Sequence, residues 1–337
     1  MASEDGTSFI EPASEGSLDD EEEDGFGATS DYDPTIDAES MMSISTSIYR
    51  HSYEHGRRYH MYRYGTYPIP NDENEGDREG LKHVMLKELL KGKLILAPIT
   101  DDPQKIFDLG TGFGEWAIEV ADLYPSAEVV GLDLSPVQPQ FVPPNCRFIV
   151  DDIEGEEWAY GRDIDYAHIR FTAPMLKDAF GVARTMLRNL KPGGWLEWQE
   201  INPRVVCDDG TVSDDYPLNK FYEILKGIWD GYGFDMFVPE RLKAEMEAMG
   251  YVNVHQRVFH VPLGAWPRDK RLRLVGMYLR ECLVQLLPAM GAKPFREAGV
   301  PHEEAERLFA DIRAAFMDRR IHARLQFYFV YGQKPII

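Results

Sequence analysis

The stretch Lys105–Gly114, with the sequence KIFDLGTGFG, decides the expected fold of this chain. Ile106 and Phe107 have the apolar character of a buried strand, and Asp108 opens a loop that carries three glycines: Gly110, Gly112 and Gly114. Glycine has no Cβ and adopts positive φ at little cost, so backbone at these positions can contact a ligand directly. A helix is expected over 115–124, and its free N–H groups would point at the same place.

A second strand is expected over 128–132, and it ends in Asp133 with Leu134 beside it. The acid stands about 20 residues beyond the glycines, the spacing at which a βαβ unit brings a carboxylate to a ribose. The pattern therefore predicts a site for a ligand that contains a nucleoside, with Asp133 and Leu134 in its wall.

Two nucleoside ligands are consistent with these residues. Counted from Gly110, the dinucleotide fingerprint requires Gly or Ala at position 115, where the chain has Glu115; counted from Gly112 it fits, but the loop then begins late. An acid at the strand end would repel a pyrophosphate and attract a primary ammonium group. S-adenosylmethionine has such an ammonium, a ribose diol and no phosphate, so the residues favour it over NAD, which stays the alternative.

The later strands add further candidates. A third strand over Cys146–Val150 is followed by acids and an apolar residue that would frame an adenine, unless they form a solvated turn: Asp151, Asp152 and Ile153. A fourth strand, DYAHIRF, places His168 and Arg170 on one face. Ligands of open α/β sheets bind at the carboxyl ends of the strands, so both are candidates for the reaction centre. The alternative is a satisfied core residue, the more frequent role of a single histidine in a strand. Glu200 ends a fifth strand, expected over 195–200 after the LKPGG turn, and would face the same cleft.

Composition limits the function classes. The chain has 337 residues and a net charge of −21, and most of that charge lies in residues 1–40, which hold 14 acids and no Lys or Arg. We expect 1–44 to be a solvated acidic tail, with a docking role for a partner as the alternative. The body is mildly acidic, so no direct nucleic-acid partner is expected. No run is apolar enough to span a membrane, and no signal peptide is visible.

The three cysteines are scattered and odd in number: Cys146, Cys207 and Cys282. They indicate a reducing compartment, cytoplasmic or nuclear, and neither a disulfide framework nor a metal site is expected.

An aromatic stretch, 48–67, precedes the core and contains six tyrosines and three histidines. Buried Tyr and His need polar partners, so such a segment is costly to place in an ordinary core. Two interpretations stand: a helix that packs its rings on the body, or a lid in which Tyr59, His60 and Tyr62 face the ligand. The expected organisation is a cap of helices over 45–104, a binding core over 105–200, and a substrate cover with two last strands over 201–337.

In the order of its motifs the chain resembles the class I S-adenosylmethionine-dependent methyltransferases, and more closely the LaeA-like family of filamentous fungi. The family's Gly-Arg-x-Tyr-His-x-Tyr segment is matched at Gly56–Tyr62, Pro-Asn-Asp-Glu at Pro70–Glu73 and the glycine loop at Asp108–Gly112. Further matches follow at Tyr124–Val129, Gly131–Pro139 and Val142–Phe148, before Asp151-Asp152. The likeness covers about 48–200.

The resemblance implies an α/β fold with a seven-stranded, mostly parallel sheet and helices on both faces. A helical cover is expected over 202–323, and strands near 251–261 and 325–331 should pair antiparallel at one edge. The implied function is methyl transfer from S-adenosylmethionine to a small molecule of fungal secondary metabolism; the alternative is a regulator that acts in a nuclear protein complex.

Site roles follow from this class of reaction. We expect Asp133 to bind the ribose hydroxyls, Asp108 with the Gly110 loop to hold the methionine end, and Asp152 with Ile153 to frame the adenine. A base, for which His168, His60 and Glu200 are candidates, is needed only if the accepting atom carries a proton.

Overall fold

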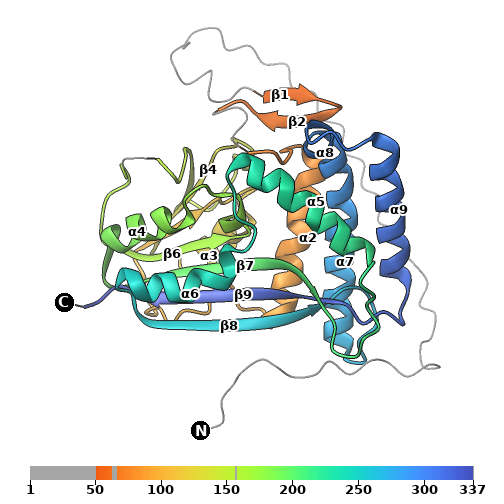
Figure 1. The fold of residues 1–337 in the computed structure, drawn as a ribbon. Coiled ribbons are helices and arrows are strands. Elements are labelled where there is room, and N and C mark those ends of the chain that lie inside the picture. Colours follow the sequence, from red (N-terminus) through yellow and green to blue (C-terminus); the bar gives the residue numbers. More distant parts are fainter. Residues whose placement is uncertain (1–50, 63–66, 156–157, 337) are drawn as a thin grey trace.

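The computed structural model describes residues 51–62, 67–155 and 158–336. The predicted acidic tail, 1–44, and parts of the aromatic stretch lie outside the described residues. Figure 1 shows one sheet flanked by helices, with a small hairpin above it.

The central sheet has seven strands in the order β5-β4-β3-β6-β7-β9-β8. Their bounds are β3 (Lys105–Leu109), β4 (Glu128–Asp133), β5 (Cys146–Val150), β6 (Ile164–Arg170), β7 (Leu190–Val206), β8 (Val252–Pro262) and β9 (Arg324–Gln333). The first five strands in this order, from β5 to β7, pair in parallel. Strand β9 runs antiparallel to both of its neighbours, β7 and β8. The prediction of a mostly parallel sheet whose last two strands pair antiparallel at one edge is confirmed.

Both faces of the sheet are covered, which is why its central strands are continuously apolar. On one face packs α3 (Glu115–Leu123), which buries Trp116, Ala117, Val120 and Ala121. On the other pack α4 (Ala179–Asn189), preceded by the 3-10 turn η1 (Ala173–Met175), and α6 (Val238–Met249). The carboxyl ends of β3, β4, β5 and β6 are left open to a ligand.

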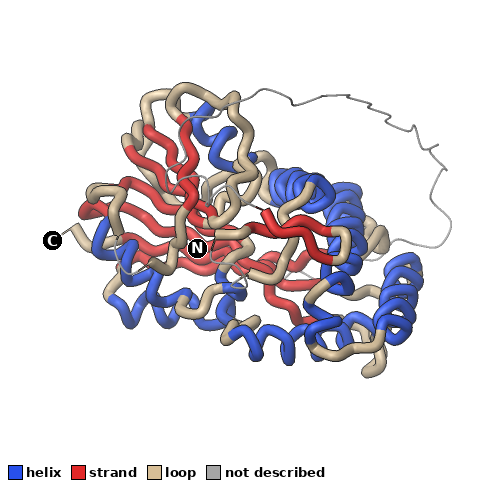
Figure 2. The backbone as a smooth tube through the Cα atoms, turned by 90° about the horizontal axis from the view of Figure 1, so that it is seen from above, coloured by secondary structure: helices blue, strands red, loops and turns tan. Residues whose placement is uncertain are grey.

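A helical cover stands at one end of the sheet, beside α2 (Glu73–Leu89) (Figure 1). It consists of α5 (Pro217–Tyr232), α7 (Lys270–Ala292), α8 (Pro294–Glu297) and α9 (His302–Met317). Residues from α2, α5, α7, α9 and β9 share one apolar cluster, so the cover is fixed to the sheet by burial of large side chains. Figure 2 shows these helices gathered beside the strand ends. No helix in the described ranges is long and apolar enough to cross a membrane.

The cap differs from the helices expected over 45–104. Its first part is a hairpin of β1 (His51–Glu54) and β2 (Arg57–His60), and helix begins only at α2. The reason lies in the connecting pair: His55 and Gly56 both have positive φ, 51° and 76°, as the favoured two-residue hairpin turn requires.

The LKPGG segment also differs from the expected turn. Strand β7 begins at Leu190, directly after α4, and runs well beyond 195–200. Its glycines sit in an irregular part of the β6–β7 pairing, where Gly193 has φ 82°. A Cβ on Gly194 would lie 2.6 Å from the carbonyl oxygen of Ile164, so the segment needs glycine for close strand packing.

Candidate active site

One cavity of about 520 Å³ opens where the parallel strands end. Its first part, the strand-end half, is formed by the loops after β3, β4 and β5; its lining includes Gly110, Gly112, Asp133, Leu134, Asp151, Asp152 and Ile153. Its second part, the cover half, is apolar, with walls from α5, α7 and β9; its lining includes Leu225, Trp229, Leu279, Leu283 and Phe327. The size and mixed lining are typical of a small-ligand site.

The acid after β4 faces the strand-end half and is held by backbone. Asp133 accepts hydrogen bonds from the N–H groups of Gly112 (2.9 Å) and Ser135 (2.8 Å), one on each carboxylate oxygen. Burial raises the pKa of Asp133 to about 6. Each oxygen keeps a free lone pair, so the carboxylate can accept two further hydrogen bonds from a ligand.

Glycine is needed at each of the three loop positions for a different structural reason. A Cβ on Gly112 would meet nothing within 4 Å, so this backbone faces open cavity. A Cβ on Gly110 would lie 2.7 Å from Oγ1 of Thr172, and one on Gly114 would lie 2.5 Å from the ring of Phe148. Gly114 therefore serves packing, and it does not line the cavity as expected.

The structure places Asp108 and His168 behind the glycine loop and not at the cavity wall. They are register partners in β3 and β6, and the Asp108 carboxylate lies 2.8 Å from Nδ1 of His168. Its other oxygen accepts from the hydroxyl of Thr111 (2.6 Å). The His168 ring is fully buried and stacks on Trp116, with centroids 3.8 Å apart. The expected contacts of Asp108 with the methionine end and of His168 with the reaction centre are corrected: the pair supports the loop from beneath.

Glu200 is likewise a supporting residue. Its Oε1 accepts from the backbone N–H groups of Thr172 (3.2 Å) and Ala173 (3.1 Å), which belong to the turn after β6. The side chain is fully buried and lines no part of the cavity, contrary to the expectation that it faces the cleft. Burial raises the pKa of Glu200 to about 8, so the carboxyl keeps its proton at neutral pH.

None of the three predicted residues of the aromatic stretch lines the cavity, although Tyr62, just after the hairpin, contacts a residue that does. The hydroxyl of Tyr62 donates to Asp151 (3.2 Å), as does that of Tyr160. Tyr59 and His60 are buried but do not line the cavity: Tyr59 lies under Nζ of Lys293 (5.1 Å), and His60 lies behind Tyr67, with ring centroids 6.0 Å apart. Adjacent strand residues point to opposite faces, so both could not face one ligand. Burial lowers the pKa of His60 to about 4, leaving the ring neutral.

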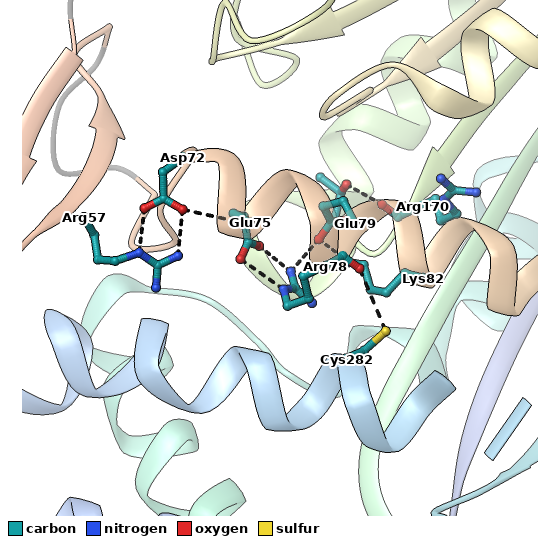
Figure 3. Close-up of polar contacts among 9 residues, drawn as sticks. Arg57, Asp72, Glu75, Arg78, Glu79, Lys82, Arg170 and Cys282 are labelled. Atoms are coloured by element: carbon teal, nitrogen blue, oxygen red, sulfur yellow. Dashed lines mark hydrogen bonds and ion pairs between the residues drawn. The ribbon is translucent and has the colours of Figure 1, made fainter. Parts of the chain in front are cut away.

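Helix α2 contributes a row of cavity-lining charges that the sequence did not single out (Figure 3): Glu75, Arg78, Glu79 and Lys82. Arg78 binds the carboxylates of Glu75 (Nε to Oε2, 3.0 Å) and Glu79, and Lys82 lies 2.6 Å from Glu79. Spacings of three and four residues put them on one helix face, which was the available signal.

The early start of α2 is explained by its cap. Asp72 accepts from the N–H of Glu75 (3.2 Å) and binds the Arg57 guanidinium through both oxygens (2.5 and 2.9 Å). This pair joins the two motifs at Gly56–Tyr62 and Pro70–Glu73, and so fixes the hairpin to the helix that lines the cavity.

Comparison with known proteins identifies the family. The methyltransferase domain family matches residues 81–256, more than half of the chain. Methyltransferase pytC of Aspergillus terreus is 36% identical over 305 residues, which cover 90% of this chain and 94% of pytC. Secondary metabolism regulator LAE1 of Cochliobolus heterostrophus is 32% identical over 291 residues, covering 84% and 94%. Among solved structures, a phosphoethanolamine N-methyltransferase of Haemonchus contortus matches 75% of this chain and 52% of its own, with 17% identity and a TM-score of 0.43.

These matches confirm the resemblance drawn from the motifs and the expected class of enzyme, an S-adenosylmethionine-dependent methyltransferase. The chain therefore belongs to the methyltransferase family, in the group that contains pytC and the LaeA-type regulators of secondary metabolism.

Proposed function

We propose that this protein methylates a small, largely apolar molecule that binds in the cover half of the cavity. The observation that carries the proposal is the continuity of one cavity from Asp133 at the strand ends to Leu283 and Phe327 under the cover. A methyl donor in the first half and an acceptor in the second would share one enclosed space.

The residues of the strand-end half fit S-adenosylmethionine. The free lone pairs of Asp133 suit the two ribose hydroxyls, and the open space at Gly112 admits a ligand against the backbone. Asp152 offers an acceptor for the adenine amino group, and Ile153 offers apolar surface for the ring. When bound, this cofactor would supply a sulfonium methyl group: an acceptor lone pair attacks the methyl carbon, the bond from sulfur to that carbon breaks, and S-adenosylhomocysteine leaves as a neutral thioether.

The chain's own contribution to the reaction is positioning. Holding the acceptor in line with the methyl group at near-attack distance removes much of the entropic barrier. The apolar walls from α5 and α7 exclude water from the acceptor. His168, His60 and Glu200 lie off the cavity wall, so none of them takes a proton from an acceptor in this arrangement.

The cover half also favours a small molecule over a protein acceptor, because its walls are apolar side chains of this same chain. A regulatory role in a protein complex is the second candidate, supported by the similarity to LAE1, which is named as a regulator.

Incubation with labelled methyl donor and a fungal extract, followed by fractionation by size, separates the two candidates. Label in small molecules supports the first, and label confined to protein supports the second. Asp133→Ala serves as the control, since it should lose the label in either case; label that persists in this variant would show that the transfer occurs without the proposed donor site.

A further inference from the structure

Arg170 is the last residue of β6, and its side chain lines the cavity beside the glycine loop. Leu109 of β3 pairs with Ile169 of β6, so Gly110 and Arg170 leave the sheet side by side. Thr172, two residues further, lies against Gly110. The guanidinium is thus set at the strand-end half, next to the backbone that faces the ligand.

Arg170 differs in its partners from Arg78 and Lys82, two other cations that line the cavity. Arg78 is neutralised by Glu75 and Glu79, and Lys82 is neutralised by Glu79 (Figure 3). Nη1 of Arg170 instead lies 3.1 Å from Nδ1 of His83. Across the described ranges, no carboxylate lies within ion-pair distance of its guanidinium.

The partner of Arg170 is a neutral ring. Burial, followed by the field of Arg170, lowers the pKa of His83 to about 4, so Nδ1 can accept a hydrogen bond at neutral pH. Nε2 of His83 lies 3.3 Å from Glu119, which orients the ring. This arrangement fixes the direction of Arg170 without a direct ion pair, and the carboxylates of Asp108, Glu79, Glu115 and Glu119 act on its charge from a greater distance.

A buried charge is costly unless it is paired, and the planar guanidinium matches a carboxylate through two parallel hydrogen bonds. Burial lowers the pKa of Arg170, and the nearby carboxylates of Asp108, Glu79, Glu115 and Glu119 offset this only in part. The remaining donors of this residue are therefore available to an anion brought by a ligand.

We propose that Arg170 binds the α-carboxylate of the methyl donor. This assignment rests on the proposed function, which puts the ribose at Asp133 and the adenine at Asp152. The donor then lies across four neighbouring strands, with adenine at β5, ribose at β4, the sulfur end over the glycine loop of β3, and the carboxylate at β6. Arg170 is a binding residue in this scheme and not a base.

Calorimetric titration of the full chain tests this with two ligands: S-adenosylhomocysteine, and its decarboxylated analogue S-adenosyl-3-thiopropylamine, which keeps the amine. Wild type should bind S-adenosylhomocysteine more tightly than the analogue by about tenfold or more, the effect of losing a charge-assisted pair. Arg170→Met should lower the affinity for S-adenosylhomocysteine by about tenfold or more and change the affinity for the analogue by less than about threefold. Arg170→Lys should restore part of the loss.

Lys82→Met is the matched control, because it removes a buried cation of the same cavity that Glu79 already neutralises. It should leave the preference for S-adenosylhomocysteine over the analogue intact. Equal losses for both ligands in Arg170→Met, or a carboxylate-selective loss in Lys82→Met, would overturn the assignment. So would a wild type that binds both ligands equally, whatever the variants do. A wild type that binds neither would contradict the proposed function itself.

Discussion

The acidic residues Asp108 of β3, Asp133 of β4 and Glu200 of β7 differ in where their oxygens point. Asp133 faces the cavity and is held by two backbone N–H groups. Asp108 is turned beneath the loop toward Thr111 and His168, and Glu200 is turned toward the backbone of the turn after β6. An acidic side chain thus faces the cavity at one of these positions and holds a loop in place at the other two.

Asp133 should dominate donor affinity among these acids. Replacing it with alanine removes the acceptor for the ribose hydroxyls, and S-adenosylhomocysteine should bind more weakly by about 1–3 kcal/mol in a calorimetric titration. Asp77→Ala, an exposed acid of α2, is the control and should bind as wild type does. Equal affinities in all three proteins would show that Asp133 does not contact the ligand.

Glu200 should make stability depend on pH. Its pKa in the folded protein, about 8, lies above the ordinary value of 4.5, because burial disfavours the charged form. The unfolded state therefore loses this proton at lower pH than the folded state. The stabilising contribution is complete below about pH 4.5 and is lost as pH rises toward 8.

Glu200→Gln keeps the oxygen that accepts from Thr172 and Ala173 but cannot ionise. In urea unfolding, the variant should be more stable than wild type at pH 8 by at least about 1 kcal/mol, and the two should converge near pH 5. A wild-type stability that rises between pH 5 and 8 relative to the variant would mean that Glu200 is ionised in the fold and stabilised as an anion.

At the scale of elements, the ion pair of Arg57 with Asp72 joins the hairpin to α2, and the contact of Tyr62 with Asp151 joins the segment after the hairpin to the loop after β5. Donor affinity should therefore depend on the hairpin. Removing residues 1–40 should leave the affinity for S-adenosylhomocysteine unchanged, whereas removing 1–66 should weaken it while circular dichroism still reports a folded domain. If the longer truncation binds as well as the full chain, the hairpin only packs against the body and is no lid.

A single substitution tests whether the contact of Tyr62 with Asp151 contributes to donor affinity. Tyr62→Phe removes the hydroxyl that donates to Asp151 and keeps the ring. The variant should bind S-adenosylhomocysteine more weakly by about 0.5–1.5 kcal/mol, the usual net contribution of one hydrogen bond. Tyr53→Phe, on the exposed face of β1, should have no effect in the same titration.

Several elements were predictable because local pattern and burial agree. Strands β3 and β4 are rich in buried apolar residues, and β4 ends in Asp133, so the place of this acid at the cavity was predictable from spacing. The hairpin was not predictable from its aromatic content, since it depends on positive φ at His55, a residue with no strong turn preference. Which oxygens face the ligand also escaped prediction, because the Asp108–His168 contact arises only when β3 and β6 pair, 60 residues apart in sequence.

At the scale of the molecule, the sheet and the helical cover line different halves of one cavity. The strand ends line one half of the cavity with backbone and carboxylates, and the helices after residue 201 line the other half mainly with apolar side chains. Only the first of these parts carries strong motifs. The cover half is made of leucines and aromatic residues from distant segments, whose meeting is set by tertiary packing and leaves no local signal.

The central claim is that donor and acceptor occupy the two halves of this cavity. The most direct measurement compares wild type with Leu283→Trp, which fills the cover half, and with Leu274→Trp, the same change at an exposed site of the same helix. Each protein is titrated with S-adenosylhomocysteine and then assayed for transfer of labelled methyl to the small-molecule fraction of a fungal extract. The account predicts that all three bind S-adenosylhomocysteine within about threefold, and that only Leu283→Trp loses transfer. Undiminished transfer by Leu283→Trp would contradict it, because the acceptor would then bind elsewhere.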